Sequence, residues 1–400
     1  MTKISNRALN LGTENAFVVL AEVERLQKTG KDIISFCIGQ PDKPTPVPIC
    51  EAATEAIKAG HTGYTSSAGI EPLRVAVADY VSRTRNIEVS AEDVVCGCGA
   101  KPFIGYTVQA VTDRDVGHEI IYPAPGFPIY ESQISAHGAI PVKLPLRNRF
   151  DLHFDLDELS EKINSKTRLI ILNSPHNPTG VVFDKTYLQK LADIIAPWED
   201  VWILSDEPYH AFVYEQSFTS IASLQGMLER TVIVDSVSKT YSMTGWRVGY
   251  AINRKLASTF SRMVTNTDSC APHPNQYAAL KALTDTQSSV TEMRDEFKIR
   301  RDHIASGLNK IAGFDCRIPQ GAFYVWPDVT KACELTGVKN STELASKLLH
   351  EAGVAVLADS HFGEAVVDEG EHLRFSYACS IEQIDEGLRR ISDFINGHNN

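Results

Sequence analysis

The sequence predicts an α/β protein: a mainly parallel sheet flanked by helices on both faces, followed by a second, smaller lobe. Two observations predict the sheet, and a third, the change of pattern near residue 295, predicts the smaller lobe. Short β-branched runs alternate with segments of helical period, and most of the runs end in polar or Gly-rich turns. This alternation is typical of strands joined by crossover helices. The runs are segments 93–96, 119–122, 168–173, 201–205 and 231–236.

The pattern changes from about residue 295. A long charged helix is expected there, and strands are expected near residues 322–326, 354–357 and 373–377, with helices between them. We therefore expect this part of the chain to form the smaller lobe.

Composition excludes several classes of protein. The chain has 400 residues and a formal net charge of -11, so it lacks the excess of cations that binding to nucleic acid needs. It has no run of 18 apolar residues and no signal-peptide core, which predicts a cytoplasmic protein. The eight cysteines are scattered, and the spacing of Cys96 and Cys98 fits none of the common zinc patterns. We expect reduced thiols and no metal site.

Polar side chains follow three of the predicted strands. Asn173 and Asn177 follow the run 168–173, Asp206 and Tyr209 follow the run 201–205, and Lys239 follows the run 231–236. Sites in parallel sheets gather beyond the carboxyl ends of the strands. If these strands are neighbours, an amide, a carboxylate, a phenol and an amine lie together on one rim.

A pyridoxal cofactor needs this set of groups. It binds as an imine to a lysine whose pKa can fall, and it needs an acid against its ring nitrogen so that the ring can accept electrons. It also needs donors to its ring oxygen and a site for its phosphate. The candidates are Lys239, Asp206, Asn177, Tyr209, Ser236, Ser238 and Arg247.

A further phosphate site is predicted where the run 93–96 leads into a helix. Gly99 and Ala100 are small enough for backbone N–H groups at the helix start to approach an anion, and Pro102 suits an early helical position. Gly97 and Gly99 begin a dinucleotide fingerprint, but Pro102 takes the third glycine position. A nicotinamide or flavin site is therefore disfavoured, and no Walker A sequence is present.

Four motifs together resemble the class I/II aminotransferases, the fold-type I pyridoxal-phosphate enzymes related to aspartate aminotransferase. They are SVSKTYSMTGWRVGY, NSPHNPTG, SDEPY and HLRFSYA, and the resemblance runs from Gly39 to Arg374. It implies an N-terminal arm with part of a small domain over residues 1–45, a large cofactor-binding domain over residues 46–294, and the rest of the small domain over residues 295–400.

The resemblance also implies roles for individual residues. Lys239 would be the Schiff-base lysine and proton carrier, Asp206 the partner of the ring nitrogen, and Asn177 and Tyr209 the partners of the ring oxygen, with Phe127 stacked on the ring. The implied phosphate-site positions are Gly99, Ala100, Ser236, Ser238 and Arg247, with Lys101 bordering them. Tyr64 matches a tyrosine that reaches the neighbouring subunit's phosphate, which implies a homodimer.

Substrate recognition is expected from Arg374, whose planar fork suits an α-carboxylate, with help from the Gly39 backbone and Asn177. Lys101 either meets a distal carboxylate of the substrate or is a surface residue at a helix start; both readings stay open. The implied reaction is a two-stage transfer of an amino group from an L-amino acid to a 2-oxo acid. The expected acceptor is 2-oxoglutarate, with an aspartate- or glutamate-type donor favoured.

Two alternative functions would keep the pyridoxal cofactor but not the transfer of an amino group. A lyase, a cyclase or a γ-substituting enzyme would use the same lysine and acid with a different outcome. A pyridoxal-binding regulator without enzyme activity would be expected to carry a basic DNA-binding module. Only about 40 residues precede Gly39 and the chain is acidic, which disfavours the regulator.

Overall fold

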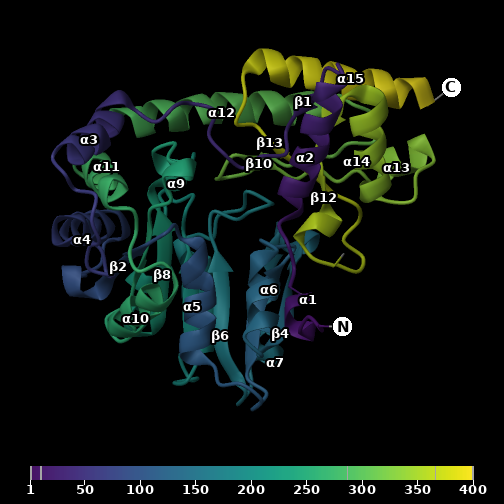
Figure 1. Cartoon of the computed structure of the whole chain (residues 1–400). Coiled ribbons are helices and arrows are strands. Elements are labelled where there is room, and N and C mark those ends of the chain that lie inside the picture. The colour runs from purple at the N-terminus through teal and green to yellow at the C-terminus, as the bar shows by residue number, and fades with distance from the viewer. Residues whose placement is uncertain (1, 10, 286, 365, 399–400) are drawn as a thin grey trace.

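The large sheet of the computed structural model contains eight strands, and the structure describes residues 2–9, 11–285, 287–364 and 366–398 (Figure 1). Five neighbouring strands are parallel, whereas β9 and β5 run antiparallel to their neighbours. In spatial order the strands are β2 (Val94–Gly97), β9 (Gly249–Ile252), β8 (Thr231–Ser236), β7 (Trp202–Asp206), β6 (Thr167–Asn173), β3 (Glu119–Ala124), β4 (Ile140–Arg147) and β5 (His153–Phe154).

Helices cover both faces of this sheet because its central strands are apolar on both faces. On β6, Leu169 and Ile171 pack against one group of helices, and Ile170 and Leu172 pack on the opposite face. The first group is α5 (Lys101–Val111), α6 (Ile129–Ala136) and α10 (Ala257–Thr267). The opposite face carries α7 (Leu156–Lys162) and α8 (Lys185–Ile195).

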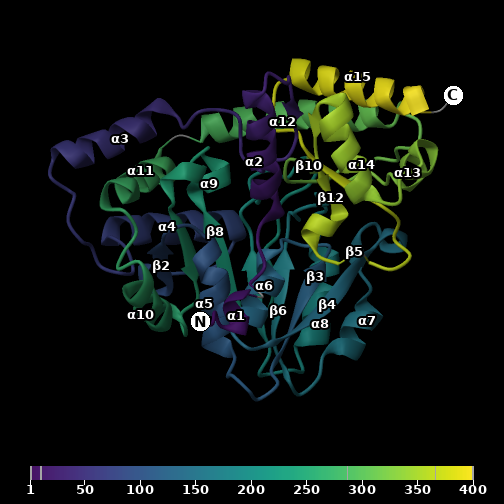
Figure 2. The same cartoon turned by 45° about the vertical axis from the view of Figure 1, so that its right-hand side comes forward.

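Three further helices cover the sheet near β2 and β8: α3 (Val47–Lys58), α4 (Glu71–Arg85) and α11 (His273–Thr284) (Figures 1 and 2). Their core includes Val77, Ile233 and Tyr250. One short helix, α9 (Val237–Thr240), follows β8 directly.

Two small sheets lie above the large sheet in Figure 1. One is antiparallel and consists of β10 (Tyr324–Val325), β13 (Leu373–Ser376) and β12 (Leu357–Ala358). The other pairs β1 (Ile34–Ser35) with β11 (Val354–Ala355), so a segment near the N-terminus lies beside the C-terminal part of the chain. The division into residues 1–45, 46–294 and 295–400 stays a prediction.

The remaining helices surround the small sheets. The long helix α12 (Ser288–Leu308) lies beside α15 (Ile381–His398) along the top of Figure 1. The others around these sheets are α2 (Asn15–Lys28), α13 (Thr330–Thr336) and α14 (Ser341–Lys347); the exception is α1 (Asn6–Leu9), which lies beside α6 at the large sheet. None of the helices in the described part of the chain combines the length and the apolar character that a membrane crossing needs.

Several boundaries differ from the sequence expectation. The charged helix α12 begins at Ser288, seven residues earlier than the pattern predicts, because its first turns contribute few buried side chains. The expected strand at 354–357 is two strands, β11 and β12, which join different sheets. The antiparallel β9 has only four residues and was not predicted.

Candidate active site

Three strand ends meet at one cavity. β6 ends at Asn173, β7 at Asp206 and β8 at Ser236, and the sheet order makes these strands neighbours. Asn173 pairs directly with Asp206 in register. The cavity of about 490 Å³ beyond them is lined by every predicted site residue except Gly99 and Tyr64. These are Gly39, Ala100, Lys101, Phe127, Asn177, Asp206, Tyr209, Ser236, Ser238, Lys239, Arg247 and Arg374.

Lys239 enters the cavity from α9. This one-turn helix begins after Ser236, whose side-chain oxygen accepts the backbone N–H of Ser238 at 3.3 Å. The Lys239 amine is half-buried and donates a hydrogen bond to the Gly39 carbonyl. Burial is the main cause that lowers its pKa to about 8; Glu14 acts against burial, and Arg374 and other nearby cations act with it. About a tenth of this amine is therefore neutral at pH 7, far more than for an ordinary lysine.

Asp206 lies at the floor of the cavity. The Tyr130 hydroxyl donates to its Oδ2 at 2.6 Å, and the Asn173 side chain donates to its backbone carbonyl at 2.9 Å. Burial is the main cause that raises the pKa of Asp206 to about 7; the hydrogen bond from Tyr130 acts against burial, and the nearby carboxylates Asp235 and Glu207 act with it. This carboxyl group would ionise more easily beside a bound cation.

A cradle for an anion lies at the start of α5. Gly99 has φ +94°, and a Cβ there would stand 2.2 Å from Nη2 of Arg247. The Arg247 guanidinium donates to the Thr244 carbonyl at 2.7 Å and to the Cys98 carbonyl at 3.4 Å. Gly249 permits a similar close approach, since a Cβ there would stand 2.3 Å from the Ala100 nitrogen. Backbone N–H groups and a guanidinium thus converge where a phosphate would bind.

Arg374 lies on β13 and is buried. Its Nη1 donates to Oδ1 of Asn177 at 2.9 Å and its Nη2 donates to the Cys37 carbonyl at 2.5 Å. Its guanidinium stands over the rings of Tyr324 and Phe362, with the central carbon 4.5 and 4.8 Å from the ring centres. Nε has no hydrogen-bond partner among the described residues. This buried guanidinium therefore keeps donor capacity for a ligand.

Lys101 is paired across the cavity. Its amine lies 2.5 Å from Oε2 of Glu14 and 5.3 Å from the centre of the Phe127 ring. The Lys101 side chain is 43% exposed and its partner is a residue of the chain itself, so both readings of Lys101 stay predictions. Tyr64 lies outside the cavity, on the loop after α3, with 88% of its surface exposed.

Several residues of this cavity received no role from the sequence, among them Glu14, Tyr130, Asn173 and Tyr324. Tyr130 stands three residues after Phe127, in the turn that leads into α6, where the Tyr130 backbone N–H donates to the Phe127 carbonyl at 3.0 Å. Asn173 opens the NSPHNPTG motif and was noted only as a strand end. Glu14 and Tyr324 carry no local signal, because only the folded chain brings them to Lys101 and to Tyr209, whose hydroxyl lies 2.8 Å from that of Tyr324.

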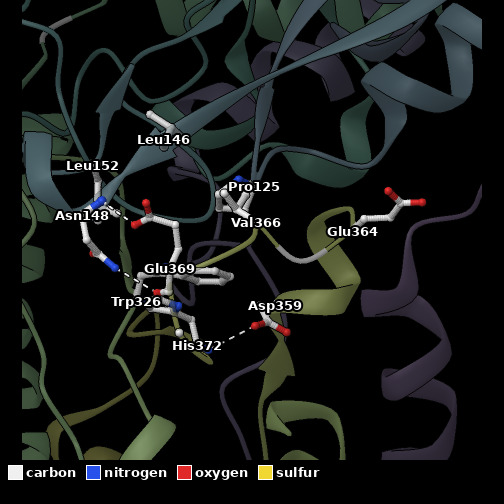
Figure 3. A pocket seen from close by; sticks show the side chains of 11 residues that line it. Pro125, Leu146, Asn148, Leu152, Trp326, Asp359, Glu364, Val366, Glu369 and His372 are labelled. Carbon is white, nitrogen blue, oxygen red and sulfur yellow. Dashed lines mark hydrogen bonds between the residues drawn. The ribbon is translucent and has the colours of Figure 1, made fainter. Parts of the chain in front are cut away.

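A second cavity lies between the segment after β4 and residues 359–372 (Figure 3). There Glu369 accepts the backbone N–H of Asn148 at 2.6 Å, and His372 stacks on Trp326 with ring centres 5.3 Å apart. Its lining includes no lysine among the described residues, so it cannot serve imine chemistry. In the described part of the chain no cluster of three or more side chains suits a metal, and all eight cysteine thiols are free.

Comparison with known proteins agrees with this geometry. The family described as aminotransferase class I and II matches residues 31–391. This chain belongs to the class I and II aminotransferases. Aminotransferases of this family use pyridoxal phosphate, and the chain is an aminotransferase that acts on small molecules with this cofactor. The glycine cradle and Arg247, the buried Asp206 and the amine of Lys239 fit the phosphate, the ring and the aldehyde of that cofactor.

Individual relatives cover nearly the whole chain. An asparagine–oxo-acid transaminase of Streptococcus mutans is 35% identical over 99% of this chain and 100% of its own. The crystal structure of an aspartate aminotransferase from Rhizobium meliloti aligns with a TM-score of 0.92 at 30% identity, over 99% of both chains. An aspartate aminotransferase from Thermus thermophilus, solved with maleate, aligns with a TM-score of 0.91 at 29% identity, over 98% of this chain and 100% of its own.

Proposed function

We propose that this aminotransferase takes its amino group from a dicarboxylic amino acid, aspartate or glutamate, and uses 2-oxoglutarate as acceptor. The observation that supports this best is the pair of cations in one cavity: Arg374 suits an α-carboxylate and Lys101 suits a second, distal one. The two solved relatives are named aspartate aminotransferases, and maleate, bound to one of them, is a dicarboxylate.

The residues of the cavity divide the work of holding the cofactor. Asp206 would pair with the ring nitrogen, Asn177 and Tyr209 with the ring oxygen, and Phe127 would stack on the ring. The phosphate would be held by Gly99, Ala100, Ser236, Ser238 and Arg247. When bound, pyridoxal phosphate supplies an aldehyde for the amine and a protonated ring that accepts electrons from the broken Cα–H bond.

Lys239 would then move the proton. Its Nζ is partly neutral because it is buried. It would take the proton from the substrate Cα and deliver it to the cofactor carbon that carries the aldehyde. Arg374 and the Gly39 backbone would fix the carboxylate, so that the Cα–H bond stands perpendicular to the ring. Hydrolysis, which consumes one water, would then release the 2-oxo product and leave the amino group on the cofactor, which completes the first half of the reaction.

We further propose that the working unit is a homodimer. Tyr64 does not line the cavity of its own chain, and its side chain is exposed to solvent. Because a tyrosine ring is largely apolar, this exposure suggests that a partner covers it. Apolar side chains on the neighbouring helix α3 are also exposed, Val47 by 67% and Ile57 by 55%. Such a surface suits a second copy of the chain, into whose cavity Tyr64 would reach.

A second candidate donor is asparagine. The pairing of Lys101 with Glu14 leaves this wall of the cavity close to neutral, which suits an uncharged side-chain amide. The relative from Streptococcus mutans is named for asparagine. An acidic donor would instead have to replace Glu14 as the partner of Lys101.

Steady-state kcat/KM for aspartate and for asparagine, with 2-oxoglutarate as acceptor, tests these donors. We expect Lys101→Met to lower the value for aspartate by about tenfold or more, close to 1.4 kcal/mol, and to change that for asparagine little. Glu14→Gln should raise the value for aspartate because it frees Lys101. Equal losses for both donors in Lys101→Met would contradict a distal-carboxylate role and leave asparagine as the better candidate.

A further inference from the structure

Three charged side chains are buried behind the cavity floor. Arg85, the last residue of α4, lies between Glu207 and Asp235, and all three side chains are at most 1% exposed. Arg85 Nε donates to Oε2 of Glu207 at 3.0 Å, and Nη2 donates to Oδ2 of Asp235 at 2.6 Å. We call these three residues the buried ion cluster.

The buried ion cluster adjoins the residues of the cavity along the chain. Asp206 and Ser236 line the cavity, whereas Glu207 and Asp235, the residues beside them in sequence, turn to Arg85. The Glu207 backbone N–H also donates to the Val234 carbonyl at 2.9 Å, which joins the ends of β7 and β8. The cluster is therefore one residue away from Asp206.

In every other hydrogen bond that the two carboxylates make to described residues, the carboxylate accepts. Glu207 Oε1 accepts from the hydroxyls of Ser205 at 2.7 Å and of Ser220 at 2.5 Å. Asp235 accepts from the Tyr250 hydroxyl at 2.9 Å and from the Ser236 backbone N–H at 2.6 Å. Burial raises the pKa of Glu207 and of Asp235 above their usual values, whereas Arg85 and these donors act against burial and favour the ionised form.

His210 lies beside the buried ion cluster but adds no positive charge to it. His210 Nδ1 lies 3.0 Å from the Glu207 carbonyl and 3.3 Å from Asp235, and its Nε2 lies 2.8 Å from the Tyr80 hydroxyl. Burial and the neighbouring Arg85 hold the pKa of His210 well below its usual range, so it is neutral. One guanidinium and two carboxylates leave the cluster with one uncompensated negative charge.

That excess charge calls for a cation or a proton nearby, because an unpaired buried charge is costly. A purely structural ion pair would need only one carboxylate. Asp206 is the next titratable group toward the cavity; around it, Tyr130 on α6 and Tyr209 after β7 have raised pKa values and stay neutral. Lys239 donates to the Gly39 carbonyl and not to Asp206.

We propose that the excess negative charge of the buried ion cluster acts through Asp206 to favour the protonated ring nitrogen of bound pyridoxal phosphate. Glu207 and Asp235 are then positioning residues: they touch neither cofactor nor substrate, and they raise the proton affinity of the pair that Asp206 forms with the ring. The inference rests on the proposed pairing of Asp206 with that nitrogen.

The test is nitrogen NMR of the holoenzyme, loaded with pyridoxal phosphate labelled at the ring nitrogen, as a function of pH. Glu207→Gln keeps the size of the side chain and removes the excess charge. We expect the pH at which the ring nitrogen loses its proton to fall by about one unit or more. Asp235→Asn removes the same charge from β8 and should shift it in the same direction, which keeps the test open if one variant fails to fold.

Ser220→Ala is the matched control. It removes a hydrogen bond to Glu207 without changing the charge of the cluster. It should lower the melting temperature but leave unchanged the pH at which the ring nitrogen loses its proton. A ring nitrogen that titrates as in the wild type in both charge variants, with the cofactor bound, would overturn the inference but leave the proposed function intact. If Asp206→Asn, with the cofactor bound, leaves the titration unchanged, the proposed pairing itself fails.

Discussion

The Lys239 amine faces two opposing demands: it must be neutral to react, yet it stands in a cavity that binds anions. Its half-buried position and the cations Arg374 and Arg247 favour the neutral form. Because the same cations serve as ligands for carboxylate and phosphate in the proposed function, binding an anion would weaken their effect on Lys239. The pKa of this lysine is thus tied to the occupancy of the cavity.

The cofactor-free protein should therefore show a shifted pH dependence when it is reloaded. We expect the rate at which Lys239 takes up pyridoxal phosphate to rise with pH and to level off above about 8, since the amine is protonated below that value. The measurement is the growth of the visible absorbance of the lysine-bound cofactor. Arg374→Gln should move the midpoint upward, and Lys239→Ala should give no such absorbance. A rate that keeps rising toward pH 10.5, the usual value for lysine, would contradict this prediction.

Asp206 should weaken the cofactor-free fold at high pH. Its pKa is about 7 in the folded chain against 3.8 as the usual value, so the folded state binds the proton more tightly and stability falls as pH rises from about 4 to 7. Asp206→Asn should thus be more stable than the wild type above pH 7, by up to about 4 kcal/mol, and equal to it below pH 4. Thermal melting of both cofactor-free proteins across this range is the measurement. A constant difference at all pH values would show that the carboxyl is not perturbed.

At the scale of elements, the anion cradle depends on how closely β9, α5 and the loop before β9 approach one another. Gly99 lies between β2 and α5, and Gly249 opens β9, which pairs antiparallel with β2. Neither position leaves room for a Cβ. The close approach brings the backbone of the α5 start beside Arg247.

Gly99→Ala should lower the affinity for pyridoxal phosphate by tenfold or more, about 1.4 kcal/mol, because the new Cβ would displace the Arg247 guanidinium. Equilibrium titration of the cofactor-free protein measures this. Gly226→Ala is the control: Gly226 also has positive φ, +76°, but a Cβ there meets nothing within 4 Å. Both variants should lose about 1 kcal/mol of stability through backbone strain, and only the first should lose cofactor affinity. Equal affinities would place the phosphate elsewhere.

At the scale of the whole molecule, the proposed homodimer makes each cavity depend on two chains. Lys239→Ala leaves Tyr64 able to serve the partner, and Tyr64→Ala leaves Lys239 in its own cavity. Each variant alone should be nearly inactive. Mixing them under conditions of subunit exchange should restore activity in about a quarter of the sites, since half of the dimers are mixed and each has one complete cavity.

Assays of the mixture against time, with the oligomeric state measured by sedimentation, check this prediction. Wild-type chains mixed with Lys239→Ala serve as the control for exchange. A mixture that stays inactive while mixed dimers form would show that Tyr64 does not act across an interface.

The comparison of expectation with structure is clearest at the strand ends. The run 231–236 is β8 without any shift, and the runs before Asn173 and Asp206 are β6 and β7 within one residue. These segments have strong local signals because central parallel strands are apolar on both faces. β9 was not predicted because its four residues are too few to show a periodic pattern. The start of α12 was predicted too far along the chain because the first turns of this helix are polar.

By itself the sequence determined the central strands, the residue types at their ends and Gly99 of the anion cradle, because these depend on local periodicity and local backbone freedom. Only the tertiary structure decided what surrounds them. It brings Arg374 to Asn177, 197 residues away, Glu14 to Lys101, and Arg85 to both carboxylates behind Asp206. Burial and charge act through space between residues distant in the chain, so the pKa values of Lys239 and Asp206 became visible only in the folded molecule.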